Sequence, residues 1–289
     1  MPTPLAHGLP DFPWDRLEPA AAIARSHPEG IIDLSIGTPV DPTPVLVQAA
    51  LAAHADAPGY PTAAGLPELR EAWCAWAQRT LGTTVTQDMV APLLGSKELV
   101  AWLPTILGLG DGTTVAIPEL AYPTYAVGAL MSGAHCVTYR DADDIPSNAQ
   151  LVWVNSPGNP TGQVLSAAQL QAVVARARSI GALVFSDECY IELGWDEQPV
   201  SVLQACDGDV TGVVSVQSLS KRSNLAGYRS GAALGDPAVI AAIIGLRKHA
   251  GMLMPTPVQH ASIAALSDHE HLRVQKEIYG RRRQVLREA

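Results

Sequence analysis

The sequence has few of the features that mark several common protein classes. Its four cysteines, Cys74, Cys136, Cys189 and Cys206, are scattered without metal-ligand spacing, so we expect reduced thiols in the cytoplasm and no metal. The amino terminus lacks a charged-then-apolar signal, and no apolar run reaches membrane-spanning length. Charged residues make up only 16% and the net charge is −9, which argues against disorder and nucleic-acid binding.

Lysine is also scarce, and one of the four lysines stands apart. Lys97, Lys248 and Lys276 lie in or next to predicted helices, whereas Lys221 follows the buried-strand run 213–216 and is flanked by small hydroxyl residues. Open α/β sheets bind ligands beyond the carboxyl ends of their strands. A lysine there with a depressed pKa can form an imine with an aldehyde cofactor, although an ordinary loop lysine is the alternative.

The order of apolar runs predicts an α/β fold with a mainly parallel sheet and helices on both faces. At 289 residues, the chain is long enough for a large core and a smaller second unit. We expect sheet strands at 114–117, 151–154, 182–186, 213–216 and 231–235, and a short strand at 31–36. Ser166 with Gln169, and Asp236 with Pro237, are predicted to begin helices.

Polar motifs follow several of these strands. The string Asn-x-Pro-x-Asn-Pro-Thr-Gly at 155–162 follows one predicted strand, and Asp187 ends the next. Burying a carboxylate at the end of a strand costs free energy unless a cation pairs with it. Gly95 precedes Ser96 and Lys97 at a helix start, where free N–H groups suit a phosphate, although it can equally be a plain helix start.

The stretch 218–229 resembles the lysine segment of the fold-type-I, class I/II aminotransferases, which hold pyridoxal 5′-phosphate as an imine on lysine. Ser230 departs from that family, which more often has an aliphatic residue there. The resemblance implies catalytic roles for Lys221, Asp187 and Tyr190. It implies cofactor binding by Ser96, Lys97, Tyr122, Asn159, Asp187, Tyr190, Ser218, Lys221 and Arg229, and by Tyr60 from the neighbouring subunit of a homodimer. It also implies that Gly37 lets the substrate carboxylate approach, although a plain turn glycine is the alternative.

The stretches 118–125, 186–195 and 220–229 are similar to the actinobacterial N-succinyldiaminopimelate aminotransferases of lysine biosynthesis. That similarity implies transamination with the glutamate/2-oxoglutarate pair as nitrogen donor. Another fold-type-I enzyme, either a different amino acid transaminase or a β-elimination lyase, is the alternative. A non-catalytic binding domain that retains the fold is a further alternative.

The same resemblance predicts a division of the chain. Residues 1–44 would form an amino-terminal arm and part of a small domain, and residues 45–267 a large cofactor-binding domain. Residues 268–289 would form an interdomain helix leading to a small-domain segment that the chain lacks. From this we expect an incomplete small domain and impaired transamination.

Overall fold

The computed structural model describes residues 5–289. Within them, seven strands form one sheet in the order β1-β7-β6-β5-β4-β2-β3. The strands are β1 Val90–Leu93, β2 Thr114–Pro118, β3 His135–Tyr139, β4 Ala149–Asn155, β5 Leu183–Asp187, β6 Val213–Ser218 and β7 Gly231–Gly235. Strands β2 to β6 pair in parallel, whereas β7 is antiparallel to both β1 and β6. The predicted mainly parallel sheet is confirmed.

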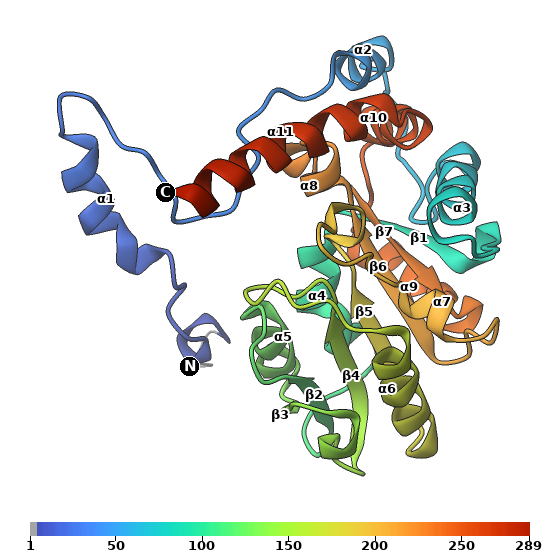
Figure 1. The fold of residues 1–289 in the computed structure, drawn as a ribbon. Coiled ribbons are helices and arrows are strands. Elements are labelled where there is room, and N and C mark those ends of the chain that lie inside the picture. The colour runs from blue at the N-terminus through green and yellow to red at the C-terminus, as the bar shows by residue number, and fades with distance from the viewer. Residues whose placement is uncertain (1–4) are drawn as a thin grey trace.

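Helices cover both faces of this sheet (Figure 1). One face packs against α3 Pro67–Leu81, α6 Ala167–Ser179, α7 Val202–Ala205 and α10 Thr256–Ser267. The other face packs against α4 Ser96–Ile106, α5 Thr124–Ser132 and α9 Pro237–Ala250. The remaining helices are α1 Glu18–Arg25, α2 Val45–Ala53, α8 Leu219–Arg222 and α11 Glu270–Glu288. Short 3₁₀ turns occur at Leu5–Gly8, Asp15–Leu17, Gln87–Met89, Ala142–Asp144, Ile191–Leu193 and Ala226–Tyr228.

The central strands are apolar because helices bury them on both sides. Every position of β6 is buried, which explains its run of valines. Trp73 and Trp76 of α3 belong to the core on one face, as their helical spacing predicts. Trp153 and Phe185 belong to the core on the other face. The sheet is therefore a support that is buried on both faces, and Asn155, Asp187 and Ser218 lie at the ends of its central strands.

Two helix starts form as predicted. Ser166 Oγ accepts the N–H of Gln169 at 3.3 Å, and Gln169 Oε1 accepts the N–H of Ser166 at 2.9 Å, which completes a capping box. Asp236 Oδ1 accepts the N–H of Ala238 at 2.8 Å, with Pro237 in the first turn of α9. These local hydrogen bonds need no distant partner, so a short sequence motif is enough to predict them.

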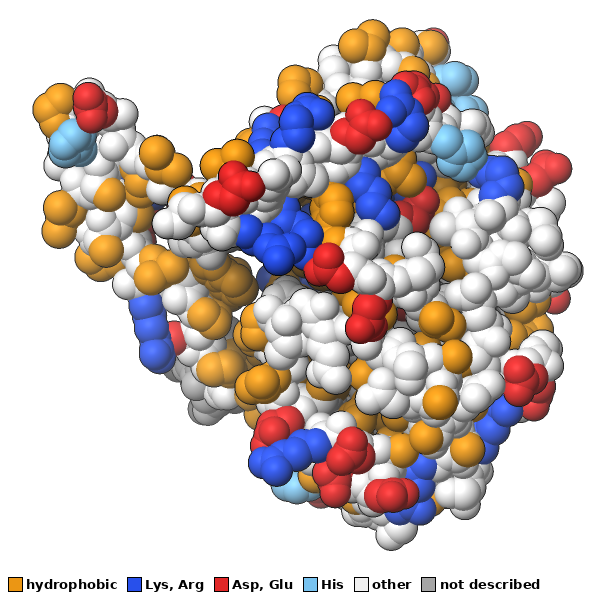
Figure 2. All heavy atoms as spheres, viewed as in Figure 1, with side chains coloured by type: hydrophobic (Ala, Val, Ile, Leu, Met, Phe, Trp, Pro, Cys, Tyr) orange, Lys and Arg blue, Asp and Glu red, His pale blue; other side chains and the backbone are white. Residues whose placement is uncertain are grey.

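The predicted strand at 31–36 is wrong. Residues 31–36 have no regular secondary structure, and Ile32 is 88% exposed. An extended segment becomes a strand only when a neighbour pairs with its backbone, and the described residues place none beside it. The segment belongs instead to an arm, residues 5–44, whose helix α1 lies away from the sheet and which carries exposed apolar side chains (Figures 1 and 2).

Helix α11 lies between this arm and the body (Figure 1). Asp41 of the arm accepts two hydrogen bonds from the Arg282 guanidinium, each of 2.6 Å. The arm and α11 are thus joined by a bidentate ion pair, which is the stronger kind. Within residues 5–289, no helix has both the length and the apolar composition needed to cross a membrane.

Candidate active site

A cavity of about 430 Å³ lies at the carboxyl ends of β4, β5 and β6, beside the first turn of α4. The predicted site residues that line it are Gly37, Ser96, Lys97, Tyr122, Asn159, Asp187, Tyr190, Ser218, Lys221 and Arg229. Tyr60 is the exception, because its side chain is 98% exposed and lies outside the cavity. The fold thus brings residues from distant segments to a single edge of the sheet.

The strand register explains why these residues meet. Asn155 at the end of β4 pairs with Asp187 at the end of β5, and β6 ends two positions further along at Ser218. Asn155 Nδ2 donates to the carbonyl of Asp187 at 2.9 Å, and Asn155 Oδ1 accepts the N–H of Asn159 at 2.7 Å. The first asparagine of the motif therefore holds the loop that carries the second one to the cavity.

Lys221 lies on the short helix α8, just beyond β6, and its Nζ donates to the carbonyl of Gly37. Burial lowers the pKa of the Lys221 ammonium, and the nearby Arg229 lowers it further, while Cys189 opposes the shift. A lowered pKa leaves more of the amine unprotonated near neutral pH. This is the property that an imine-forming lysine needs.

Asp187 lies at the base of the cavity and is 6% exposed. Its Oδ2 accepts the Tyr125 hydroxyl at 2.9 Å, and its Oδ1 accepts the N–H of Cys189 at 3.3 Å. Burial raises the pKa of this carboxyl, and the hydrogen bonds from Cys189 and Tyr125 offset part of that rise. In the described part of the chain, no lysine, arginine or histidine forms an ion pair with it. The cavity therefore offers a carboxylate that a bound cationic group can satisfy.

The first turn of α4 also lines the cavity, and it is suited to an anion. Gly95 precedes the helix with φ of 77° and gives it no side-chain cap, so the first N–H groups of α4 remain available. The Arg229 guanidinium fills the space where a side chain at Gly95 would stand, since a Cβ there would lie 2.3 Å from Arg229 Nη2. Glycine suits this position because its φ of 77° would strain any other residue, and because it leaves room for a guanidinium beside the helix amino end.

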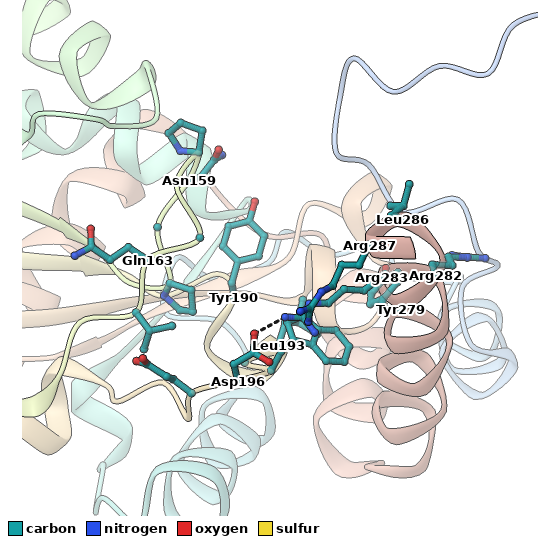
Figure 3. A pocket seen from close by; sticks show the side chains of 18 residues that line it. Asn159, Gln163, Tyr190, Leu193, Asp196, Tyr279, Arg282, Arg283, Leu286 and Arg287 are labelled. Carbon is teal, nitrogen blue, oxygen red and sulfur yellow. Dashed lines mark hydrogen bonds and ion pairs between the residues drawn. The ribbon is translucent and has the colours of Figure 1, made fainter. Parts of the chain in front are cut away.

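Three further predicted residues line the cavity. Tyr122, just before α5, packs edge-on against Tyr125 with ring centroids 6.1 Å apart. Burial raises the pKa of the Tyr190 hydroxyl, so this group stays a hydrogen-bond donor at neutral pH. Asn159 and Tyr190 also line a second, larger groove of about 1120 Å³, which reaches α11 (Figure 3).

The arginines of α11 at this groove largely have partners. Arg283 forms an ion pair with Asp196 and lies over the Trp195 ring, with its Cζ 5.6 Å from the ring centroid (Figure 3). Arg282 is paired with Asp41. Both guanidiniums are therefore engaged in ion pairs.

Sequence reasoning missed several residues at the cavity. Tyr125 is fully buried and donates to Asp187, whereas its sequence context allowed simple packing. The Cys189 thiol lies 3.1 Å from Ser96 Oγ and joins β5 to the first turn of α4. Phe12 and Trp14 line the cavity from the arm, and no local pattern could place so distant a segment there. Asn155 and Ser220 also line it.

Ser230, the departure from the family pattern, does not line the cavity. It is fully buried, and its Oγ lies 2.7 Å from Ser262 Oγ of α10. A hydroxyl at this position is tolerated because a second hydroxyl satisfies it. Ser230 therefore contributes to the contact between the start of β7 and α10, outside the cavity.

A family model described as aminotransferase class I and II matches residues 29–289. The chain belongs to this family. It is 53% identical over 282 residues to a probable aminotransferase, Rv1178, of Mycobacterium tuberculosis, covering 96% of this chain and 68% of that protein. It is 51% identical over 284 residues to 4-dedimethylamino-4-oxo-anhydrotetracycline transaminase OxyQ of Streptomyces rimosus. That match covers 97% of this chain and 79% of OxyQ.

More distant relatives agree. The chain is 33% identical over 303 residues to LL-diaminopimelate aminotransferase of Dehalococcoides mccartyi, covering 97% of this chain and 77% of that protein. A crystal structure of an aminotransferase from Neisseria meningitidis superposes with a TM-score of 0.86 at 33% identity. The superposition covers 96% of this chain and 76% of that one. The protein is a transaminase, and enzymes of its family depend on pyridoxal 5′-phosphate.

The residues at the cavity fit this cofactor. A phosphate suits the uncapped start of α4 together with Arg229. A protonated pyridine nitrogen suits Asp187, which has no cationic partner in the described chain. An aldehyde suits Lys221, whose burial keeps its pKa low. The first turn of α4, the Asp187 carboxylate and the Lys221 amine thus line one cavity, and each suits a different group of the cofactor.

Proposed function

We propose that this transaminase exchanges an amino group between glutamate and the keto acid of the N-succinyldiaminopimelate pair, as a cytoplasmic step of lysine biosynthesis. The similarity of the stretches 118–125, 186–195 and 220–229 to enzymes of that type supports the choice of substrate. The likeness to LL-diaminopimelate aminotransferase supports it more weakly, because that enzyme is named for a related amino acid.

We assign Lys221 as the residue that holds the cofactor and moves the proton at the substrate α-carbon. When bound, pyridoxal phosphate supplies a carbonyl that accepts the amine and a ring that accepts electrons. Asp187 keeps a proton on the ring nitrogen, because its buried carboxylate is stabilised by a cation. Tyr190 and Asn159 donate hydrogen bonds to the phenolic oxygen of the cofactor.

The other assignments concern binding. Arg229, Ser218 and the first turn of α4 at Ser96 and Lys97 hold the phosphate. Tyr122 stacks on the ring with its flat face. Gly37 lets the substrate carboxylate approach the backbone. Tyr60 of the partner subunit reaches the phosphate in a homodimer, which agrees with the exposure of Tyr60 outside its own cavity.

The observation that carries this proposal is the approach of three segments to one cavity: α8 with its amine, β5 with its carboxylate and α4 with its free amides. The test is reduction of the purified holoenzyme with borohydride, followed by peptide mapping. We expect the pyridoxyl mass on Lys221. Labelling of Lys97 or Lys248 instead would contradict the assignment.

The amino donor and acceptor need a second measurement. Titration of the holoenzyme with glutamate should bleach the cofactor's visible absorption band, and addition of a keto-acid acceptor should restore it. The acceptor is then identified by comparing the N-succinylated keto acid with simple 2-oxo acids. Product formation without any acceptor would indicate β-elimination and would overturn transamination as the principal reaction.

A ring ketone is a second candidate acceptor. The chain is 51% identical to OxyQ, which is named for a transamination at an oxo-anhydrotetracycline. Phe12, Trp14 and Tyr122 also place aromatic surface at the cavity, which would suit a flat, apolar acceptor. Higher catalytic efficiency with a polycyclic ketone than with the N-succinylated keto acid would favour this second candidate.

A further inference from the structure

Helix α11 touches the lysine segment through one buried histidine. His271 Nε2 lies 2.8 Å from Ser223 Oγ, and His271 Nδ1 lies 2.6 Å from Asp268 Oδ2. A carboxylate only accepts, so Nδ1 carries the proton and Nε2 accepts the Ser223 hydroxyl. Burial lowers the pKa of His271, which agrees with this neutral form, while Asp268 and Glu192 oppose the shift and Arg222 adds to it.

A second contact lies one turn further along α11. Asn224 adopts a left-handed backbone with φ of 55°, and its Nδ2 donates to Gln275 Oε1 at 2.8 Å. The Tyr279 hydroxyl donates to Asn224 Oδ1 at 3.2 Å. Gln275 Nε2 in turn donates to Asp41 Oδ2 at 2.8 Å. The strained asparagine is thus held on both ends of its amide, with the arm as a third support.

The Ser223, His271 and Asp268 contacts have the order of a nucleophilic triad, but they do not form a second active site. Ser223 is fully buried, so no substrate can reach its hydroxyl. Its backbone N–H instead donates to the carbonyl of Leu219 at 3.2 Å and ends α8. The backbone N–H of Ser223 thus ends the helix that carries Lys221, and its hydroxyl joins that helix end to α11.

The neighbouring arginine anchors the same helix on its other side. Arg222 Nε lies 2.5 Å from Glu192 Oε2, and both side chains are buried. Trp76 Nε1 donates to the same carboxylate oxygen at 3.0 Å. Arg222 is thus fixed to Glu192, whereas Ser223 and Asn224 are both fixed to α11, and Lys221 alone of residues 221–224 lines the cavity.

We propose that His271 and Gln275 are positioning residues, through which α11 sets the orientation of Lys221 by way of Ser223 and Asn224. Figure 1 shows α8 directly beside α11, and the two helices are in contact. The inference rests on the proposed role of Lys221 in the reaction. The proposal means that contacts made by α11 keep the Lys221 amine buried. The pKa of that amine therefore depends on α11.

The experiment measures the Lys221 amine without the cofactor. The full chain, stripped of pyridoxal phosphate, is labelled with trace acetic anhydride between pH 6 and 11, and each lysine is quantified by peptide mass spectrometry. The chain has only four lysines, so Lys248 and Lys276 serve as internal references. In the parent protein, we expect Lys221 to titrate below both references, because burial lowers its pKa.

The variants are His271→Leu, Ser223→Ala and Gln275→Leu. Loss of either contact loosens α8 and lets water reach the amine, so the pKa of Lys221 should rise toward those of the references. We expect the midpoint of its labelling profile against pH to rise by about half to one pKa unit. His271→Gln keeps an amide that can reach Ser223 Oγ, so it should retain the parent behaviour.

The matched control is His249→Leu, which removes an exposed histidine near the end of α9. It should leave Lys221 unchanged. If His271→Leu and Gln275→Leu lower the melting temperature but leave the pKa of Lys221 at its parent value, the contacts are merely structural and the proposal fails. If His271→Leu does not fold, Ser223→Ala and Gln275→Leu decide the question. None of these outcomes depends on which lysine carries the cofactor.

Discussion

The two acidic residues at the end of β5 are neighbours in sequence, yet they belong to different environments. Asp187 faces the cavity and accepts hydrogen bonds from Tyr125 and from the N–H of Cys189. Glu188, 1% exposed, lies away from the cavity. It accepts hydrogen bonds of 2.8 Å from the N–H of Val202, from Ser215 Oγ and from Gln217 Nε2.

The difference shows that the role of a buried carboxylate depends on its hydrogen-bond donors and on whether it lines a cavity. Burial raises the pKa of both groups, so the pKa direction alone does not distinguish them. Glu188 has neutral donors from its own chain on both oxygens, and it lines neither the cavity nor the larger groove. Asp187 has space in front of it and no cation. We infer that Asp187 serves the reaction and Glu188 serves stability.

The largest expected effect is on Asp187. Asp187→Ala should still bind pyridoxal phosphate but lose turnover with glutamate by at least on the order of a hundredfold, because the charge that stabilises the protonated ring is gone. The measurements are the glutamate half-reaction rate and cofactor binding by absorbance. Near-normal turnover would show that this carboxylate is structural, like its neighbour.

Glu188→Ala should show the opposite pattern. Three donors lose a charged acceptor, so the free energy of unfolding should fall by about 2–3 kcal/mol, while the turnover of the folded holoenzyme stays near the parent value. Urea unfolding and the same half-reaction assay measure the two quantities. If folded Glu188→Ala loses as much turnover as Asp187→Ala, then Glu188 also serves the reaction, and the distinction between the two carboxylates is wrong.

Tyr125→Phe tests the donor to Asp187. The variant removes one hydrogen bond of 2.9 Å without removing the carboxylate, so we expect turnover to fall roughly three- to tenfold. Tyr139→Phe is a matched control, because the buried Tyr139 hydroxyl donates to the carbonyl of Trp153 at 2.7 Å, outside the cavity. Equal losses of turnover in the two variants would indicate a general packing effect.

The smallest effect is a pH dependence of stability in the cofactor-free protein. A carboxyl whose pKa is raised on folding contributes stability at low pH, and that stability is lost as pH rises through the folded pKa. Asp187→Asn, which cannot ionise, should therefore gain stability relative to the parent at neutral pH. The gain should shrink as pH falls below the folded pKa of Asp187. Urea unfolding of both proteins between pH 4 and 8 measures it, and a pH-independent difference would contradict the raised pKa.

Local chemistry in the sequence was enough to predict the strand ends and the motifs they carry. The valine run of β6, the asparagine motif after β4 and Asp187 at the end of β5 could be placed because parallel strands present their carboxyl ends at one edge. The capping residues Ser166 and Asp236 were also predictable, since their hydrogen bonds span only a few residues.

Contacts between distant segments were decided only by the folded chain. No sequence pattern showed that Tyr125 would donate to Asp187, that Phe12 and Trp14 of the arm would line the cavity, or that His271 would hold Ser223. The failed strand at 31–36 has the same cause, because pairing requires a neighbour that local sequence does not specify. Residue type and period are local properties, whereas burial and the identity of a partner depend on which elements pack together.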